Sequence, residues 1–208
     1  ISRGKNYTNK LVFETLAGLI QVEVGQLGDQ VKISMTQPKP KFGLTIDKKV
    51  LSKIGGIPEN SILSKPQVVS TGLPFPIVLV DTLDTLQKVK IDYHAFDKFR
   101  ATVPEKDLME PFWVCLNSPR RTGLTFSRLL LQSSGRNEDP FTGSATGAMA
   151  AYLWASGLIR NTKFTAHQGD YLGRPGEAEV EIICARGSIS GIKVTGSAYI
   201  LMTGKLKI

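Results

Sequence analysis

The sequence of 208 residues predicts an α+β fold in which a β-sheet curls around one buried central helix. Two observations lead to this prediction. Residues from about 144 to 157 are apolar or small on every side, and a helix without a polar face is typically buried. Short segments of alternating or continuous apolar residues, which are typical of strands, lie on both sides of this helix.

The elements before the central helix are expected to begin with a hairpin. Residues 19–24 alternate apolar and polar side chains, a turn follows, and residues 30–35 alternate again. Helical spacing predicts a short helix over 48–54, which Gly55 and Gly56 would end. The other elements expected before the central helix are strands over 67–70, 76–80, 112–117 and 124–132, a turn segment over 82–89, and a short helix over 93–99 with Asp92 as N-cap. After the central helix we expect strands over 163–166, 177–184, 188–197 and 199–207.

The most informative segment is Glu138-Asp139-Pro140-Phe141-Thr142-Gly143-Ser144, directly before the central helix. The small residues at its end let backbone N–H groups approach a bound anion, and unpaired N–H groups at a helix start attract a carboxylate. A carboxylate such as Asp139 beside that anion can move a proton on or off the bound molecule. The alternative interpretation is that Asp139 and Ser144 only cap an ordinary buried helix.

Composition and charge argue against two classes of partner. The chain is 41% hydrophobic and 21% charged, which is ordinary for a soluble protein. Its net charge is +8, but the basic residues are scattered and do not interleave with aromatic residues, so we expect a solvated surface and no nucleic acid. No apolar run reaches the roughly 20 residues of a membrane helix, so we expect no membrane partner.

The two cysteines, Cys115 and Cys184, lie inside apolar strand-like runs. They lack the spacing of metal ligands, so we expect two buried free thiols and no metal site. Free thiols fit a reducing compartment, and we expect a cytoplasmic protein.

The string Glu-Asp-Pro-x-Thr-Gly-Ser-Ala over 138–145, followed by Gln168-Gly169 and Gly173-Arg174-Pro175, resembles the phenazine-biosynthesis PhzF-like isomerase family. Val69-Ser70-Thr71-Gly72 is similar to the mid-chain Ser-Thr-Gly segment of that family, and 194–205 to its closing strands. The resemblance implies a diaminopimelate-epimerase-like fold. Two pseudo-symmetric barrel-like domains would each wrap around a central helix, with the active site in the cleft between them.

The resemblance also implies a reaction and its residues. Asp139 would be the acid of the second domain, and Thr142, Gly143, Ser144 and Gly72 would bind the substrate. The substrate would be a small carboxylic acid, isomerised or epimerised by proton transfer at carbon without cofactor or metal. The protein would be a homodimer. Related racemases use two thiols at the helix mouths, whereas this chain has carboxylates there.

Members of that family carry an earlier glutamate, used as a proton shuttle, and a Gly-His-x-Thr motif, and neither is found in this sequence. We therefore expect an incomplete first domain, with 1–66 as the remainder of the N-terminal domain and 67–208 as the C-terminal domain. Such a chain would contain one of two facing half-sites. The alternative function is a non-catalytic binding or scaffold protein on the same fold.

Overall fold

The computed structural model describes residues 9–16, 18–27, 30–104, 107–132, 137–199 and 202–205. Within these residues the strands are β1 (Lys10–Thr15), β2 (Gly18–Leu27), β3 (Gln30–Gln37), β4 (Lys41–Thr45), β5 (Gln67–Ser70), β6 (Pro74–Val80), β7 (Phe112–Cys115), β8 (Thr125–Leu130), β9 (Glu138–Asp139), β10 (Lys163–Gln168), β11 (Gly176–Ala185) and β12 (Ser188–Ala198). The helices are α1 (Lys48–Gly55), α2 (Leu83–Lys88), α3 (Tyr93–Arg100) and α4 (Gly143–Ala155), with short 3-10 turns at Glu59–Ser61 and Asp170–Leu172.

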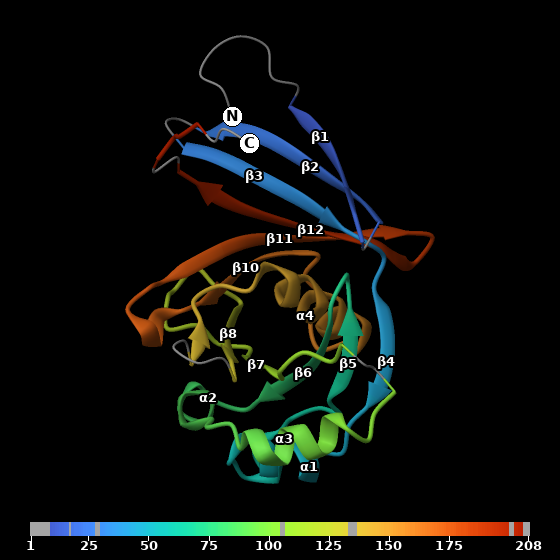
Figure 1. Cartoon of the computed structure of the whole chain (residues 1–208), viewed down its shortest axis with the longest axis vertical. Coiled ribbons are helices and arrows are strands. Elements are labelled where there is room, and N and C mark those ends of the chain that lie inside the picture. Colours follow the sequence, from blue (N-terminus) through green and yellow to red (C-terminus); the bar gives the residue numbers. More distant parts are fainter. Residues whose placement is uncertain are drawn as a thin grey trace.

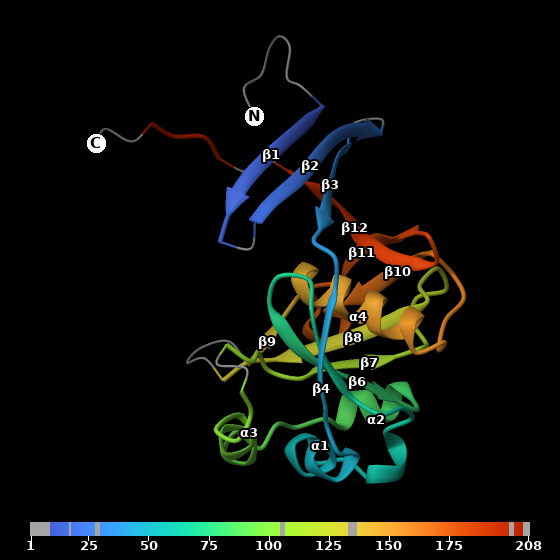
Figure 2. The same cartoon turned by 90° about the vertical axis from the view of Figure 1, so that its right-hand side faces the viewer.

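All these strands belong to one sheet. Its order is β1-β2-β3-β12-β11-β10-β8-β7-β6-β5-β4, and β9 pairs with β8 beside this path. Neighbouring strands are antiparallel except for the parallel pairs β6–β7 and β8–β10. Figures 1 and 2 show that the part from β12 to β4 curls around α4, whereas β1, β2 and β3 extend away from it.

The central helix α4 is buried along most of its length. Every residue from Ala145 to Leu153 is buried, and the helix packs against β5, β6, β7, β11 and β12. Burying a side chain as large as Met149 or Leu153 contributes about 1.5–3 kcal/mol. The polar end of Tyr152 is satisfied, because its hydroxyl donates to the carbonyl of Lys65 over 2.9 Å. The expected α+β fold, with a sheet wrapped around a helix without a polar face, is confirmed.

A second core lies on the other face of β6 and β7. Ile77 and Leu79 point towards α4, whereas Val78 and Val80 join the second core. Helices α1, α2 and α3 cover this second core, and Trp113 lies fully buried within it. The parallel pair β6–β7 is therefore buried on both faces, which explains its nearly continuous run of apolar residues.

Strands β1, β2 and β3 continue the apolar face of the sheet beyond α4. Val194 pairs with Met35, and Met35 pairs with Val22, so these side chains share the face that packs on α4. On β1 the same face carries Leu11 and Phe13, which are 40% and 51% exposed. In the part of the chain that the structure describes, no helix covers this end of the sheet.

Most elements expected from the sequence are present at the expected places. The hairpin β2–β3 and helices α1 and α3 are confirmed, and Asp92 caps α3 by accepting from the amide of Ala95 over 2.9 Å. The segment expected to be a turn over 82–89 is instead the helix α2, since Thr82 caps it and buried Leu86 anchors it. Strand β4 was not expected.

Two further expectations are corrected. The expected final strand over 199–207 is not found in the part of that range that the structure describes, where Tyr199 and residues 202–205 are not in a strand; the rest of the range lies outside the described residues. Cys115 is buried as expected, but Cys184 is exposed. Cys184 follows an irregularity in the β11–β12 pairing near the end of that hairpin, where its side chain no longer faces the core.

The elements on both sides of residue 66 pack together in part. Strand β4 pairs with β5, and Leu51 of α1 lies in the same core as Val80. The division into 1–66 and 67–208 stays a prediction. Among the residues with described positions, no helix has the length and apolar character needed to cross a membrane.

The packing of Gly55 against Trp113 can be tested. A Cβ atom at Gly55 would overlap the indole ring of Trp113, which is fully buried. We expect Gly55→Ala to lower the free energy of unfolding by about 1–3 kcal/mol, as overpacking does in a filled core. Urea unfolding measures this change. Gly196→Ala is the control, because a Cβ there meets nothing within 4 Å. Equal stability of both variants would contradict the packing described.

Candidate active site

The acidic motif lies where the sheet leads into α4. Strand β9 pairs with the end of β8, and Asp139 lies opposite Leu129. Pro140 and Phe141 then turn the chain, and α4 begins at Gly143. This short path places a half-buried carboxylate next to the N-terminus of the central helix.

Thr142 and Gln168 hold Asp139 in place. The hydroxyl of Thr142 donates to Oδ2 of Asp139 over 2.7 Å. The side-chain amide of Gln168 donates to the carbonyl of Asp139 over 2.8 Å and to the hydroxyl of Thr142 over 3.1 Å. Its oxygen accepts from the amide of Thr142 over 3.1 Å. Asp139 is therefore fixed through its backbone and through one of its two carboxylate oxygens.

The N-terminus of α4 is open. Thr142 occupies the N-cap position, but its side chain makes no capping hydrogen bond to the helix. Within the described residues, the amides of Gly143 and Ser144 have no acceptor, and the first turn contains no acidic side chain. A Cβ at Gly143 would meet nothing within 4 Å. Free N–H groups and the helix dipole together favour an anion here.

A second buried amide supports the same helix end from the other side. Gln37, at the end of β3, donates to the carbonyl of Gly143 over 2.8 Å and accepts from the hydroxyl of Thr71 over 2.6 Å. Gly147 makes this possible, because a Cβ there would overlap the Gln37 amide. Sequence reasoning missed Gln37, since a lone glutamine at the end of a strand carries no recognisable signal.

The structure brings the expected site residues to one end of α4. Asp139, Thr142, Gly143 and Ser144 follow one another along the chain. Gly72 is exposed in the turn directly after Thr71, and the Thr71 hydroxyl lies 3.4 Å from the carbonyl of Ser144. Their roles in catalysis and substrate binding stay predictions.

Glu138 has a different structural role from Asp139. Its carboxylate accepts from Nε and Nη2 of Arg128 over 3.0 Å and 2.7 Å, and both side chains are about nine-tenths buried. Arg128 also donates to the carbonyls of Leu86 and Gln87 at the end of α2. The two adjacent carboxylates of the motif therefore differ, because Glu138 anchors β9 to the sheet and Asp139 borders the open helix end.

His167 is fully buried beside Gln168. Its Nδ1 lies 2.5 Å from the hydroxyl of Ser118, and its Nε2 lies 3.7 Å from a carboxylate oxygen of Glu177. Arg120 closes the cluster by pairing with Glu177 and Asp170. Burial and the charge of Arg120 lower the pKa of His167, and the carboxylates of Glu177 and Asp170 oppose this shift. Arg120, expected to be part of a solvated surface, instead braces the loop after β7.

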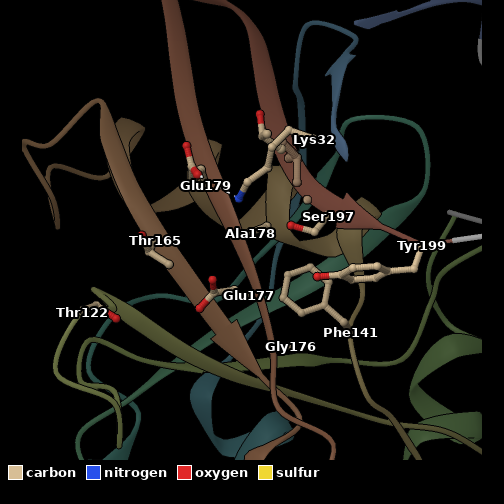
Figure 3. Close-up of a pocket in the computed structure, with 13 residues that line it drawn as sticks. Lys32, Thr122, Phe141, Thr165, Gly176, Glu177, Ala178, Glu179, Ser197 and Tyr199 are labelled. Atoms are coloured by element: carbon tan, nitrogen blue, oxygen red, sulfur yellow. Dashed lines mark hydrogen bonds and ion pairs between the residues drawn. The ribbon is translucent and has the colours of Figure 1, made fainter. Parts of the chain in front are cut away.

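A groove of about 750 Å³ lies on the opposite side of the sheet from α4. Figure 3 shows Phe141 and Tyr199 at one end of this groove, and Lys32 with Glu179 towards the other. Lys32 pairs with Glu179 over 3.3 Å. Asp139, Gly143 and Ser144 are not part of its lining. The groove is therefore separate from the open end of α4.

Comparison with solved structures defines the class of fold. A phenazine biosynthesis protein of the PhzF family from Bacillus anthracis matches with a TM-score of 0.73 over 92% of this chain and 66% of that one, at 22% identity. A predicted epimerase from Pseudomonas aeruginosa matches with a TM-score of 0.71 over 97% of this chain and 70% of that one, at 26% identity. The chain thus has an α+β epimerase-like fold.

Sequence comparison then identifies the family. The family model described as phenazine biosynthesis-like protein, PhzC-PhzF, matches residues 1–204. An uncharacterized isomerase of Clostridium acetobutylicum is 32% identical over 209 residues, which cover 96% of this chain and 68% of that protein. The chain belongs to the phenazine biosynthesis-like protein family, as its acidic motif indicates. It spans about two thirds of the length of these relatives.

The buried pair of Arg128 and Glu138 can be tested by removing the cation. Arg128→Met leaves Glu138 buried without a partner, so we expect the free energy of unfolding to fall by about 3–5 kcal/mol. Lys88→Met is the matched control, because it breaks an exposed pair with Asp84 and should cost less than about 1 kcal/mol. Urea denaturation of both variants measures the difference, and similar losses would show that the buried pair does not anchor β9.

The lowered pKa of His167 predicts that the stability of the protein depends on pH. Its pKa in the folded chain is lower than the ordinary value of 6.5, so the unfolded chain takes up this proton first as the pH falls. The free energy of unfolding should therefore decrease as the pH falls from about 6.5 towards the folded pKa.

Urea titrations at several values between about pH 7 and pH 5 measure this slope. His167→Gln should have a shallower slope than the unmodified protein. A slope left unchanged by His167→Gln would show that this histidine takes up its proton equally in the folded and unfolded chain.

Proposed function

We propose that this chain carries one acid–base half-site of an isomerase or epimerase that transfers a proton at a carbon atom of a small carboxylic acid. The observation that supports this most directly is the position of Asp139, which lies beside the uncapped N-terminus of α4. In this proposal the N-terminus of α4 binds an anion and Asp139 exchanges a proton, and the two groups lie side by side.

The proposed chemistry uses each part of this arrangement. The substrate carboxylate binds at the free amides of Gly143 and Ser144. A carboxylate oxygen of Asp139 removes a proton from the neighbouring carbon, and the electron pair of the broken C–H bond moves towards the substrate carboxylate. The helix N-terminus stabilises the negative charge that develops there. Return of a proton to the carbon completes the isomerisation.

One oxygen of Asp139 is free for this task. Oδ2 accepts from Thr142, whereas no described residue donates to Oδ1. A base must come within hydrogen-bond reach of the proton that it removes, and an oxygen without a protein donor is available for that contact. We therefore assign proton transfer to Oδ1.

The comparisons support this class of reaction through the names of the matched proteins, which include an isomerase and a predicted epimerase. The resemblance of the acidic motif further implies a second acid–base group, a glutamate, facing Asp139. Action without cofactor or metal, a homodimeric assembly and a cytoplasmic location belong to the same proposal.

A second function fits the same site. The open end of α4 could bind a carboxylate without any turnover, which would make the protein a binding or scaffold protein on an isomerase fold. The amides of Gly143 and Ser144 support binding in both cases. Only proton exchange distinguishes the two functions.

Deuterium exchange tests the proposed function. The protein is incubated in D₂O with a panel of α-amino acids and 2-hydroxy acids, each as a single enantiomer, and loss of the C–H signal is followed by NMR. Asp139→Asn should slow exchange of any responsive compound by about 10²–10⁴-fold, the usual contribution of an acid–base group. The control variant Asp84→Asn, which changes an exposed residue of α2, should catalyse this exchange as fast as the unmodified protein.

The amide signals of Gly143 and Ser144 report binding in matched samples prepared in H₂O, where these free amides keep their protons. Shifts of these signals with undiminished exchange in Asp139→Asn would exclude Asp139 as the acid–base group. Shifts without exchange in any protein would favour the binding protein. Exchange that Asp139→Asn abolishes would support the isomerase.

A further inference from the structure

Gln168, at the end of β10, is buried and hydrogen bonded inside the protein. Its side chain is 1% exposed. Its oxygen accepts from the amide of Thr142, and its nitrogen donates to the carbonyl of Asp139 and to the hydroxyl of Thr142. A buried amide is costly unless it is hydrogen bonded, and this one has protein partners for its oxygen and for both of its N–H groups. Any effect of Gln168 on a ligand therefore passes through these two residues.

The backbone fixes which way the Gln168 amide points. The amide of Thr142 can only donate, so it requires the oxygen of Gln168. The carbonyl of Asp139 can only accept, so it requires the nitrogen. Reversing the amide would place two donors together at one contact and two acceptors at the other.

This orientation determines the direction of the Thr142 hydroxyl. Because the nitrogen of Gln168 can only donate, the oxygen of Thr142 accepts from it. The single hydroxyl proton of Thr142 is then free to be donated, and Oδ2 of Asp139 lies 2.7 Å away. The Thr142 oxygen accepts from Gln168 and makes no capping hydrogen bond to the helix, which is the role that threonine usually has at an N-cap.

Gly169 keeps Gln168 close to the turn. Its φ is +89°, and a Cβ there would overlap the carbonyl oxygen atoms of Pro140 and Arg174. Only glycine combines this conformation with such a close approach of three backbone segments. The Gln168-Gly169 pair is thus built to hold the turn between β9 and α4.

We propose that Gln168 is a positioning residue that directs the Thr142 hydroxyl onto Asp139 and thereby keeps the N-terminus of α4 uncapped. One amide accounts for both features of the site, namely the oriented carboxylate and the free helix amides. The catalytic part of this inference rests on the proposed function, whereas the orientation of the Thr142 hydroxyl does not.

Gln37 supplies a matched comparison. Both glutamines are nearly fully buried, and both bind the first turn of α4 or its N-cap residue through their side chains. Gln37 donates a hydrogen bond to the carbonyl of Gly143, but among the described residues it has no hydrogen bond with Thr142 or Asp139. If Gln168 only stabilised the helix end, replacing either glutamine would have the same effect on the site.

The first test does not depend on turnover. In Gln168→Met, the amide of Thr142 loses its acceptor and should exchange with solvent at least about tenfold faster, as measured by NMR. In Gln37→Met, the exchange of the Thr142 amide should be unchanged. Equal acceleration in both variants, or in neither, would overturn the specific role of Gln168.

The second test is a double-mutant cycle on deuterium exchange, with the panel compound that exchanges fastest. Gln168→Met and Thr142→Val should each lower kcat by about 10- to 100-fold, because each removes the donor to a charged group or its orientation. The double variant should be no slower than the slower single variant. Gln37→Met with Thr142→Val should instead be additive, and additivity in both pairs would overturn the proposal.

Two variants at position 142 keep the test decisive if Gln168→Met does not fold. Thr142→Ser retains the hydroxyl and should retain kcat, whereas Thr142→Val should lose it, and equal rates would overturn the proposal. If no panel compound exchanges in any variant, the proposed function has failed. The amide exchange of Thr142 then still decides whether Gln168 holds the turn.

Discussion

The complete burial of α4 is the constraint on which the rest of this structure depends. A helix enclosed by a curled sheet cannot offer a polar side face to a ligand, so its chemistry is confined to its ends. At the N-terminal end the backbone itself supplies the polar groups, because the first amides have no partner within the helix. The small residues along α4, including Gly147, let the strands approach closely enough to enclose it.

Two buried glutamines bind backbone groups at the N-terminal end of α4. Gln37 comes from β3 and Gln168 from β10, so the open end of α4 is held by segments that are far apart in the chain. Each amide donates to a backbone carbonyl at this end, and Gln168 also gives the buried amide of Thr142 an acceptor. The amides of Gly143 and Ser144 have no acceptor among the described residues, and this is the basis on which the end of α4 is proposed as a site.

The two adjacent carboxylates of the acidic motif have different surroundings and, in the proposed function, different roles. Glu138 and Asp139 point to opposite sides of β9, as neighbouring residues of a strand do. One side is occupied by Arg128, whose charge compensates Glu138 in the interior, and the other faces the open end of α4. Two adjacent residues of β10 also have different roles. His167 joins the cluster of Arg120, and Gln168 holds Asp139.

The sequence by itself determined the α+β class, the buried central helix, most strands and the acidic segment at the helix start, because these depend on local periodicity and on a contiguous motif. It did not reveal that Glu138 pairs with Arg128, or identify Gln37, because these partners are not adjacent in the chain. The helix over 83–88 was missed because it is only six residues long and depends on its Thr82 cap and on the burial of Leu86. Only the tertiary structure decided which polar groups are paired and which remain free, because folding brings together groups that are far apart in the sequence.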